Sequence, residues 1–134
     1  MSHRIYAKSS PPEELEAHSD AVASQARRYV ESSVSSNRFS QLGVDIATGR
    51  LEKLAEFAGE YHDPGKAHPD WQEACLARIN GAERKPPFPP HSARSAAYAF
   101  DVLSTEDLSE VERVAVVVSI LHHHTPFATD HMRL

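Results

Sequence analysis

Apolar residues recur at helical spacing between residues 51 and 62, and this pattern constrains the fold more than any other feature of the chain. The positions that match one buried helix face are Leu51, Leu54, Ala55, Ala58, Tyr61 and His62. Pro64 and Gly65 follow at once and are typical of a helix stop. We therefore expect His62 to continue the buried face, with Asp63 at the tip of the helix.

Similar spacing predicts further helices before and after this one. Pro11 to Glu14 is typical of a helix start, and the buried face that follows would be Leu15, His18, Val22, Ala26, Tyr29 and Val30. Pro69 would open a short helix that bears Trp71, Ala74, Cys75 and Ile79. Residues 32–49 lack periodicity and are expected to form a loop that could contain a short helix, and residues 80–90 are expected to form a loop because they are rich in proline.

Two more helices are predicted near the end of the chain. One would begin at His91, with apolar positions Ala96, Ala97, Phe100 and Leu103. The other is introduced by Ser109 and Glu112, which fit a capping box. Its buried face would be Val111, Val114, Ala115, Val118, Leu121 and His122, with a second apolar edge at Val117, Ile120, Leu121 and His124. A helix apolar over so much of its circumference should be central to the core.

No segment alternates like a strand, so the prediction is an all-α single domain over residues 1–134, with about five helices. A chain of 134 residues suits one domain. Its single cysteine, Cys75, excludes an internal disulfide framework and is expected to be buried and inert. There is no signal-peptide pattern and no apolar run of the roughly 18–20 residues of a membrane span, so a cytoplasmic protein without membrane contact is expected.

The net charge of −5 argues against a protein that coats nucleic acid. It does not argue against an enzyme that acts on nucleic acid, because bound divalent cations would reverse the sign of the local potential. The unusual feature of the composition is histidine, with nine residues in the chain. Several of these histidines lie at expected inward positions or helix ends: His18, His62, His91 and the triplet His122 to His124.

Taken singly, these histidines have ordinary explanations. One histidine on an apolar face is often a hydrogen-bonded core residue, and a His-Asp pair at a helix end often caps the helix. Taken together, four inward histidine positions and one aspartate favour a metal site, because imidazole and carboxylate are ligands for Mn, Fe, Co, Ni or Zn. One aspartate could bridge two ions, and two such ions could activate water and stabilise an in-line phosphoryl displacement.

Four segments in this order resemble a known family. They are YAKS and LEAHS (Tyr6–Ser9 and Leu15–Ser19), HDPGKAHPDWQ (His62–Gln72), PHSARSA (Pro90–Ala96) and ILHHHTP (Ile120–Pro126). The chain resembles the HD superfamily of metal-dependent phosphohydrolases and, more narrowly, the HD nuclease of type I CRISPR interference. The resemblance covers residues 6–127 and implies an HD-domain-like helical core.

The resemblance also implies the residues of the site. His18, His62 and Asp63 would hold one divalent ion, and Asp63, His91, His123 and His124 a second, with Asp63 as the bridge. Mn, Fe, Co or Ni would suit these ligands best, with Mg or Zn as alternatives. His122 is an uncertain member, because the family shows two histidines there and this chain has three.

Three further residues receive roles from the resemblance. Lys66 matches a lysine near the His-Asp pair and would stabilise phosphate charge or orient the attacking water, although a charge at a helix C-terminus explains it as well. Ser92 and Ser95 could touch the substrate, and helix capping and close packing explain these serines equally well.

The implied function is hydrolysis of phosphodiester bonds in single-stranded DNA during CRISPR antiviral defence. A helicase or a crRNA-guided effector complex would deliver the strand. Two alternatives remain: an HD phosphohydrolase of nucleotides or cyclic nucleotides, and a catalytically impaired scaffold that docks a helicase or effector complex.

One departure from the family bears on these alternatives. HD phosphohydrolases supply a further aspartate from a later helix, whereas the only acid after the histidine triplet here is Asp130. Either Asp130 substitutes, or the chain is an N-terminal fragment or one part of a split domain that lacks its final helix, or one metal site is incomplete. We favour the fragment or split domain, because a central helix so close to the end of the chain would be poorly covered.

Overall fold

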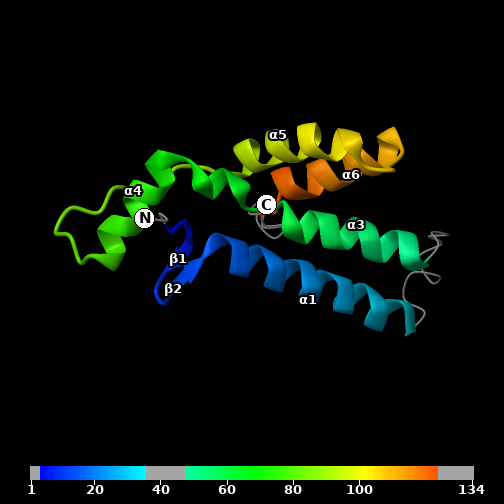
Figure 1. The fold of residues 1–134 in the computed structure, drawn as a ribbon, viewed down its shortest axis with the longest axis horizontal. Helices are drawn as coiled ribbons and strands as arrows, with labels where there is room; N and C mark the ends of the chain where they lie inside the picture. The colour runs from blue at the N-terminus through cyan, green and yellow to red at the C-terminus, as the bar shows by residue number, and fades with distance from the viewer. Residues whose placement is uncertain (1–3, 36–47, 124–134) are drawn as a thin grey trace, which may run out of the picture.

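The computed structural model describes residues 4–35 and 48–123, and five α-helices make up most of this part of the chain (Figure 1). They are α1 (Leu15–Ser35), α3 (Thr48–Glu60), α4 (Pro69–Ile79), α5 (Ser92–Val102) and α6 (Glu110–Leu121). Two short 3₁₀ turns, η1 (Pro64–Ala67) and η2 (Leu103–Thr105), follow α3 and α5. The prediction of an all-α fold is confirmed, apart from one small sheet.

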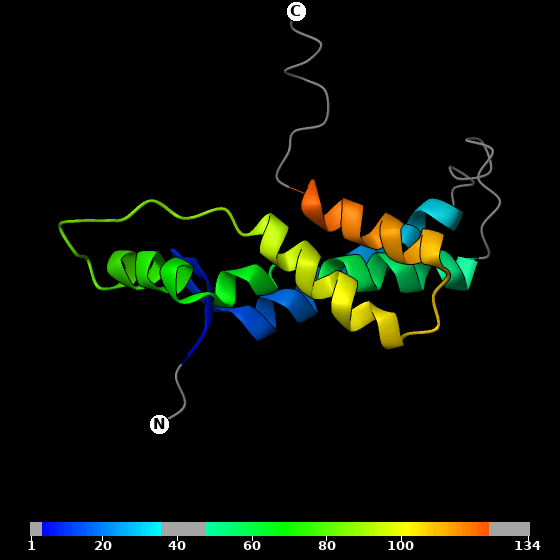
Figure 2. The same ribbon diagram turned by 90° about the horizontal axis from the view of Figure 1, so that it is seen from above.

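The helices lie in pairs, and their directions alternate. Helix α1 packs along α3, α5 packs along α6, and α3 also contacts α6. In Figures 1 and 2, α1 and α5 start near the middle of the molecule, where α3 and α6 end. The N-terminal ends of two helices therefore meet the C-terminal ends of two others, which brings residues from distant parts of the sequence to one point.

The apolar core lies between α3, α5 and α6. Its buried members are Ala96, Ala99, Leu103, Val116 and Ile120, with Leu54, Phe57 and Tyr61 of α3 and the following turn among the residues packed against them. Helices α1 and α3 approach closely at Gly59, where a Cβ atom would lie 2.7 Å from the Cα of Ala23. This glycine thus permits the two helix backbones to touch beside the end of α3.

The predicted helical start at residues 11–14 is wrong. Residues Pro12–Glu14 form a strand, β2, that pairs antiparallel with β1 (Tyr6–Ser9), and α1 begins only at Leu15. Two successive prolines disfavour helical backbone in the residue before each and remove two backbone donors, which suits an extended segment. Strands this short contain too few residues for an alternating pattern to be recognised.

The boundaries around the His-Asp pair differ slightly from the prediction. Helix α3 ends at Glu60, and Asp63 then precedes the 3₁₀ turn that Pro64 opens. Other predicted boundaries are confirmed: α4 opens at Pro69, α5 follows directly after His91, and Ser109 and Glu112 form a complete capping box.

The predicted buried face of α6 is wrong. The buried residues of this helix are Val116 and Ile120, whereas a stripe of four apolar residues on the other side is exposed. This stripe, called the α6 stripe below, consists of Val111, Val114, Val118 and Leu121. Because α6 is apolar almost all round, the helical period alone does not identify the side that faces the core.

Smaller corrections of the same kind apply elsewhere. In α5, Phe100 and Ala97 were predicted to be buried but are exposed, and Ala99 is buried instead. In α1, Tyr29 was predicted to be buried and is exposed. None of the helices in residues 4–35 and 48–123 is both long and apolar enough to cross a membrane.

Candidate metal centre

Four histidine rings surround the carboxylate of Asp63, one from each of four helix ends. His18 lies in the first turn of α1, His62 just after α3, His91 at the N-cap of α5, and His123 just after α6. Neighbouring rings lie 5.3 Å apart between centroids, in the order His18, His62, His123, His91. The alternating helix directions described above produce this convergence.

The two oxygens of Asp63 face different histidines. Oδ2 lies 3.1 Å from Nε2 of His18 and 2.8 Å from Nε2 of His62. Oδ1 lies 2.8 Å from Nε2 of His91 and 3.3 Å from Nε2 of His123. Each oxygen and its two imidazole nitrogens form a group whose atoms are close enough together to hold a metal ion.

The orientation of the rings tests whether a cation fits between these atoms. Nδ1 of His62 donates to the carbonyl of Gly59 at 2.6 Å, and Nδ1 of His123 donates to the carbonyl of Ile120. A carbonyl only accepts, so the proton of each neutral ring is on Nδ1 and the lone pair of Nε2 points at Asp63. A lone pair and a carboxylate repel each other unless a cation or a proton lies between them. Imidazole and carboxylate donors in this orientation suit a divalent metal.

The surroundings of Asp63 keep it ionised. Burial alone would raise its pKa, since its side chain is only 2% exposed. With a proton in the contacts to His62 and His91, these hydrogen bonds and the charge of Lys66 outweigh this effect and hold the pKa of Asp63 well below its usual range. The aspartate is therefore a carboxylate at any physiological pH.

Lys66 also faces Asp63, from the η1 turn. Its buried ammonium group lies 3.0 Å from Oδ2 of Asp63, donates to the carbonyl of Ala7 at 3.2 Å, and stands 5.1 Å from the ring centre of Trp71. Trp71 itself is buried. The structure thus brings Lys66 to the centre, and its role toward a phosphate stays a prediction.

Gln72 fixes the N-terminal hairpin to the segment that carries Asp63 and Lys66. Its side-chain oxygen accepts from the backbone N–H of Tyr6 at 2.9 Å, and its side-chain nitrogen donates to the carbonyls of Tyr6 at 2.8 Å and Lys66 at 2.7 Å. The buried amide thus satisfies three backbone groups and connects the hairpin to the turn that carries Lys66.

The two serines predicted to touch substrate lie at the start of α5. Ser95 is fully buried, and its hydroxyl accepts from the backbone N–H of Gly65 at 2.8 Å, which ties η1 to α5. Ser92 is half-buried one position after His91. Contact of either serine with substrate stays a prediction, and for Ser95 the structure adds a packing role.

Other sequence candidates lie apart from the cluster or outside the described residues. His122 is exposed at the end of α6, one residue before His123. His124 and Asp130 lie outside the described residues, so their predicted roles stay predictions. Cys75 is buried, and burial raises the pKa of its thiol, as expected for an inert cysteine.

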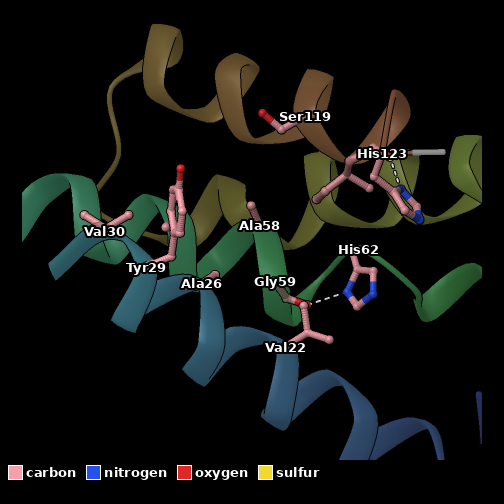
Figure 3. A pocket seen from close by; sticks show the side chains of 11 residues that line it. Val22, Ala26, Tyr29, Val30, Ala58, Gly59, His62, Ser119 and His123 are labelled. Carbon is pink, nitrogen blue, oxygen red and sulfur yellow. Dashed lines mark hydrogen bonds between the residues drawn. The ribbon is translucent and has the colours of Figure 1, made fainter. Parts of the chain in front are cut away.

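An apolar groove leads to the cluster between α1, α3 and α6. It has a volume of about 360 Å³ and is lined on its sides by small or apolar residues such as Val22, Ala26 and Ala58. His62 and His123 stand together at one end of the groove (Figure 3). Among the described residues, the groove therefore ends at these two rings.

Sequence reasoning missed two polar residues beside the cluster. Glu13 accepts a hydrogen bond from Nδ1 of His18 at 3.0 Å, which lowers the pKa of Glu13, and Gln72 binds the hairpin as described above. The sequence does not reveal the contact of Glu13, because the pattern of residues 11–14 predicts the start of a helix and not a strand. Gln72 ends the motif HDPGKAHPDWQ, but nothing in the sequence indicates that its amide binds the N-terminal hairpin.

In a comparison with protein families, the chain matches the HD domain of Cas3 over residues 6–133. The chain belongs to the Cas3 HD domain family. The resemblance stated from the sequence, to an HD nuclease domain of type I CRISPR systems, is confirmed. A Cas3 HD domain implies a metal-dependent nuclease role in CRISPR defence, and the histidine groups around Asp63 are the residues that could bind divalent metal here.

Neither the search of curated proteins nor the search of solved structures returned a significant match. The family match and the geometry of the site therefore carry the functional argument for this Cas3 HD domain.

Proposed function

We propose that this domain hydrolyses phosphodiester bonds of single-stranded DNA with two divalent metal ions bridged by Asp63, as part of CRISPR defence. The observation that carries the proposal is that the two carboxylate oxygens of Asp63 contact different pairs of histidines. One carboxylate oxygen faces His18 and His62, and the other faces His91 and His123. A single-ion site would need only one of these two groups.

The first ion would be held by His18, His62 and Asp63, and the second by Asp63, His91 and His123, with His124 as a further candidate ligand. Mn, Fe, Co or Ni would suit a set in which imidazoles outnumber carboxylates. When bound, such ions supply a water nucleophile at neutral pH and neutralise charge on the phosphate that is attacked.

The charge of the centre favours a phosphodiester substrate. Asp63 is the only carboxylate in the two described ligand groups, and Lys66 adds a positive charge beside it. Two divalent ions would thus leave the centre strongly positive, which attracts an anionic strand although the whole chain has a net charge of −5. Because the surface is acidic overall, a helicase or a crRNA-guided complex would deliver the strand.

The proposal is tested by removing the bridge. We expect Asp63→Ala to lose Mn²⁺ binding and to lower the nicking of circular single-stranded DNA by more than the roughly 100-fold that loss of an outer hydrogen-bond partner can cause. His68→Ala is the matched control, because His68 is an exposed histidine that pairs with Asp70 away from the cluster. Metal content is measured by elemental analysis and nicking by gel electrophoresis.

Several results would contradict the proposal. Nicking at the wild-type rate by Asp63→Ala would show that the active site lies elsewhere. A wild-type chain that binds two ions but hydrolyses only nucleotides would identify the nucleotide phosphohydrolase instead. If the chain binds no metal and does not nick DNA with any divalent ion, the remaining function is that of a catalytically impaired scaffold. His18→Ala should weaken mainly one ion, and His123→Ala mainly the other.

A further inference from the structure

The N-terminal hairpin is too small to be stable by itself and is held in place by the residues that surround the site. A two-stranded sheet of this size is marginal in water. Here Gln72 pairs with both backbone groups of Tyr6, and Lys66 donates to Ala7. The hairpin therefore has a fixed position relative to Asp63, and it leads directly into the first turn of α1, where His18 lies.

Glu13, in the second strand of this hairpin, faces His18. Its Oε1 lies 3.0 Å from Nδ1 of His18, while Nε2 of the same ring lies 3.1 Å from Asp63. The histidine thus stands between two carboxylates, one on each ring nitrogen. The side chain of Glu13 is 34% exposed, whereas that of His18 is only 12% exposed.

His18 differs from its neighbours in the kind of partner that orients it. His62 and His123 donate from Nδ1 to carbonyls three residues earlier in the chain, Gly59 and Ile120. These contacts are local and need no other element. His18 instead receives its partner from a separate element, and that partner carries a full negative charge, so it attracts the Nδ1 proton more strongly than a carbonyl does.

We infer that Glu13 is a positioning residue for His18, and that it makes the cation site of His18, His62 and Asp63 depend on the hairpin. The inference rests on the proposed function. Glu13 would fix the tautomer that leaves Nε2 free to bind a cation and would raise the basicity of that nitrogen, as a carboxylate partner does for metal-bound histidines. The second group, Asp63, His91 and His123, has no contact with Glu13 among the described interactions.

If Glu13 served only to stabilise the hairpin, its contact with Lys8 would have to contribute more to stability than its contact with His18. Its second oxygen lies 3.6 Å from the ammonium of Lys8, but both side chains are substantially exposed, and such ion pairs contribute little. The neighbouring Glu14 makes a comparable exposed pair with Arg4 at 3.4 Å, and none of its contacts within residues 4–35 and 48–123 is with a histidine. Glu14 is therefore the natural control for any effect of charge in this strand.

The test is a titration of the intact chain with Mn²⁺, followed by calorimetry, for the wild type, Glu13→Ala, Glu13→Gln and Glu14→Ala. We expect the wild type to bind two ions. Glu13→Ala should weaken one of them by about 10–100-fold and leave the other within about twofold. Glu13→Gln keeps an acceptor for Nδ1 and should be intermediate, whereas Glu14→Ala should bind as the wild type does.

A second readout examines the tautomer directly. Nitrogen NMR of ¹⁵N-histidine-labelled protein without metal should show Nδ1 of His18 protonated in the wild type and in Glu13→Gln, whether or not Nε2 beside Asp63 also carries a proton, and should show the Nδ1 proton lost in Glu13→Ala. A merely structural role would leave the tautomer unchanged. Thermal unfolding without metal checks that the variants are folded.

The outcomes separate this inference from the proposed function. If the wild type binds two ions and Glu13→Ala binds both equally well, or loses both to the same extent while folded, the positioning role is wrong and the two-ion proposal stands. If the wild type binds no Mn²⁺, the two-ion proposal fails and the positioning role fails with it.

Discussion

At the scale of single residues, the site depends on close contact between the η1 turn and the start of α5. Gly65 donates its backbone N–H to Ser95, and a Cβ atom on Gly65 would lie 2.3 Å from the carbonyl oxygen of His91. No side chain fits there without moving the backbone. The glycine therefore allows the turn that follows Asp63 to reach the residue that precedes α5.

We expect Gly65→Ala to lower the free energy of unfolding by about 1–3 kcal/mol, because overpacking of a buried contact forces the backbone to shift. The shift would also separate His91 from Asp63, so binding of the second ion should weaken. Urea unfolding and Mn²⁺ titration measure the two effects.

Gly49→Ala is the control for this substitution. Gly49 lies in α3, and no atom from another described part of the chain lies within 4 Å of the point that a Cβ would occupy there, so alanine should raise stability by about 0.5–1 kcal/mol through helix propensity. Equal effects of the two substitutions would show that Gly65 is not constrained by its neighbours.

At the scale of elements, α6 is held in place by its first turn as well as by its core face. The Ser109 side chain accepts from the backbone N–H of Glu112, and the Glu112 side chain accepts from the backbone N–H of Ser109. The Glu112 carboxylate also pairs with Arg50 at the start of α3. The start of α6 is thereby fixed to α3, and His123 lies at its other end.

Ser109→Ala should therefore cost about 1 kcal/mol of stability, the usual effect of losing an N-cap side chain. Ser119→Ala in the same helix is the control, since Ser119 is exposed and its hydroxyl only donates to the carbonyl of Ala115. Chemical denaturation compares the two. A loss in Ser119→Ala as large as in Ser109→Ala would argue against a capping effect.

The helices could be predicted from the sequence where a stop signal and a period coincide, and less well elsewhere. Pro64, Pro69 and the Ser109–Glu112 box gave boundaries that the structure confirms to within a few residues. The strand at Pro12–Glu14 is not predicted, because three residues that begin with the second of two prolines show no period, and acids after proline are equally typical of a helix start.

The residues of the candidate site could be predicted from the sequence better than the contacts around them could. His18, His62, Asp63, His91 and His123 lie in one cluster, and their role as ligands stays a prediction. Glu13 could not be placed, because its contact with His18 depends on a hairpin that periodicity does not reveal.

At the scale of the whole molecule, one side of α6 is apolar and uncovered by the described residues. Within the α6 stripe, Val111 is 79% exposed and Val118 is 46% exposed. Contiguous apolar surface of this kind is typical of contact with another polypeptide or of self-association. The core buried by the same helix is small, with Val116 and Ile120 as its only fully buried residues.

Val118→Lys should accordingly leave the free energy of unfolding within about 0.5 kcal/mol of the wild type, as for most exposed substitutions, while reducing self-association. Val116→Lys, two residues away and 3% exposed, should cost several times more because it buries a charge. Light scattering and urea unfolding follow the two properties. Similar destabilisation by both substitutions would show that the stripe is covered in solution.

The order of the ligands along the chain has a consequence for how the site matures. His18, His62 and Asp63 all precede His123, which follows Asp63 by 60 residues (123 minus 63). At ordinary rates of translation this separation corresponds to about 3–12 s. On a ribosome, the group of His18, His62 and Asp63 is thus synthesised first, and a nascent chain holds half of the centre before the other half exists.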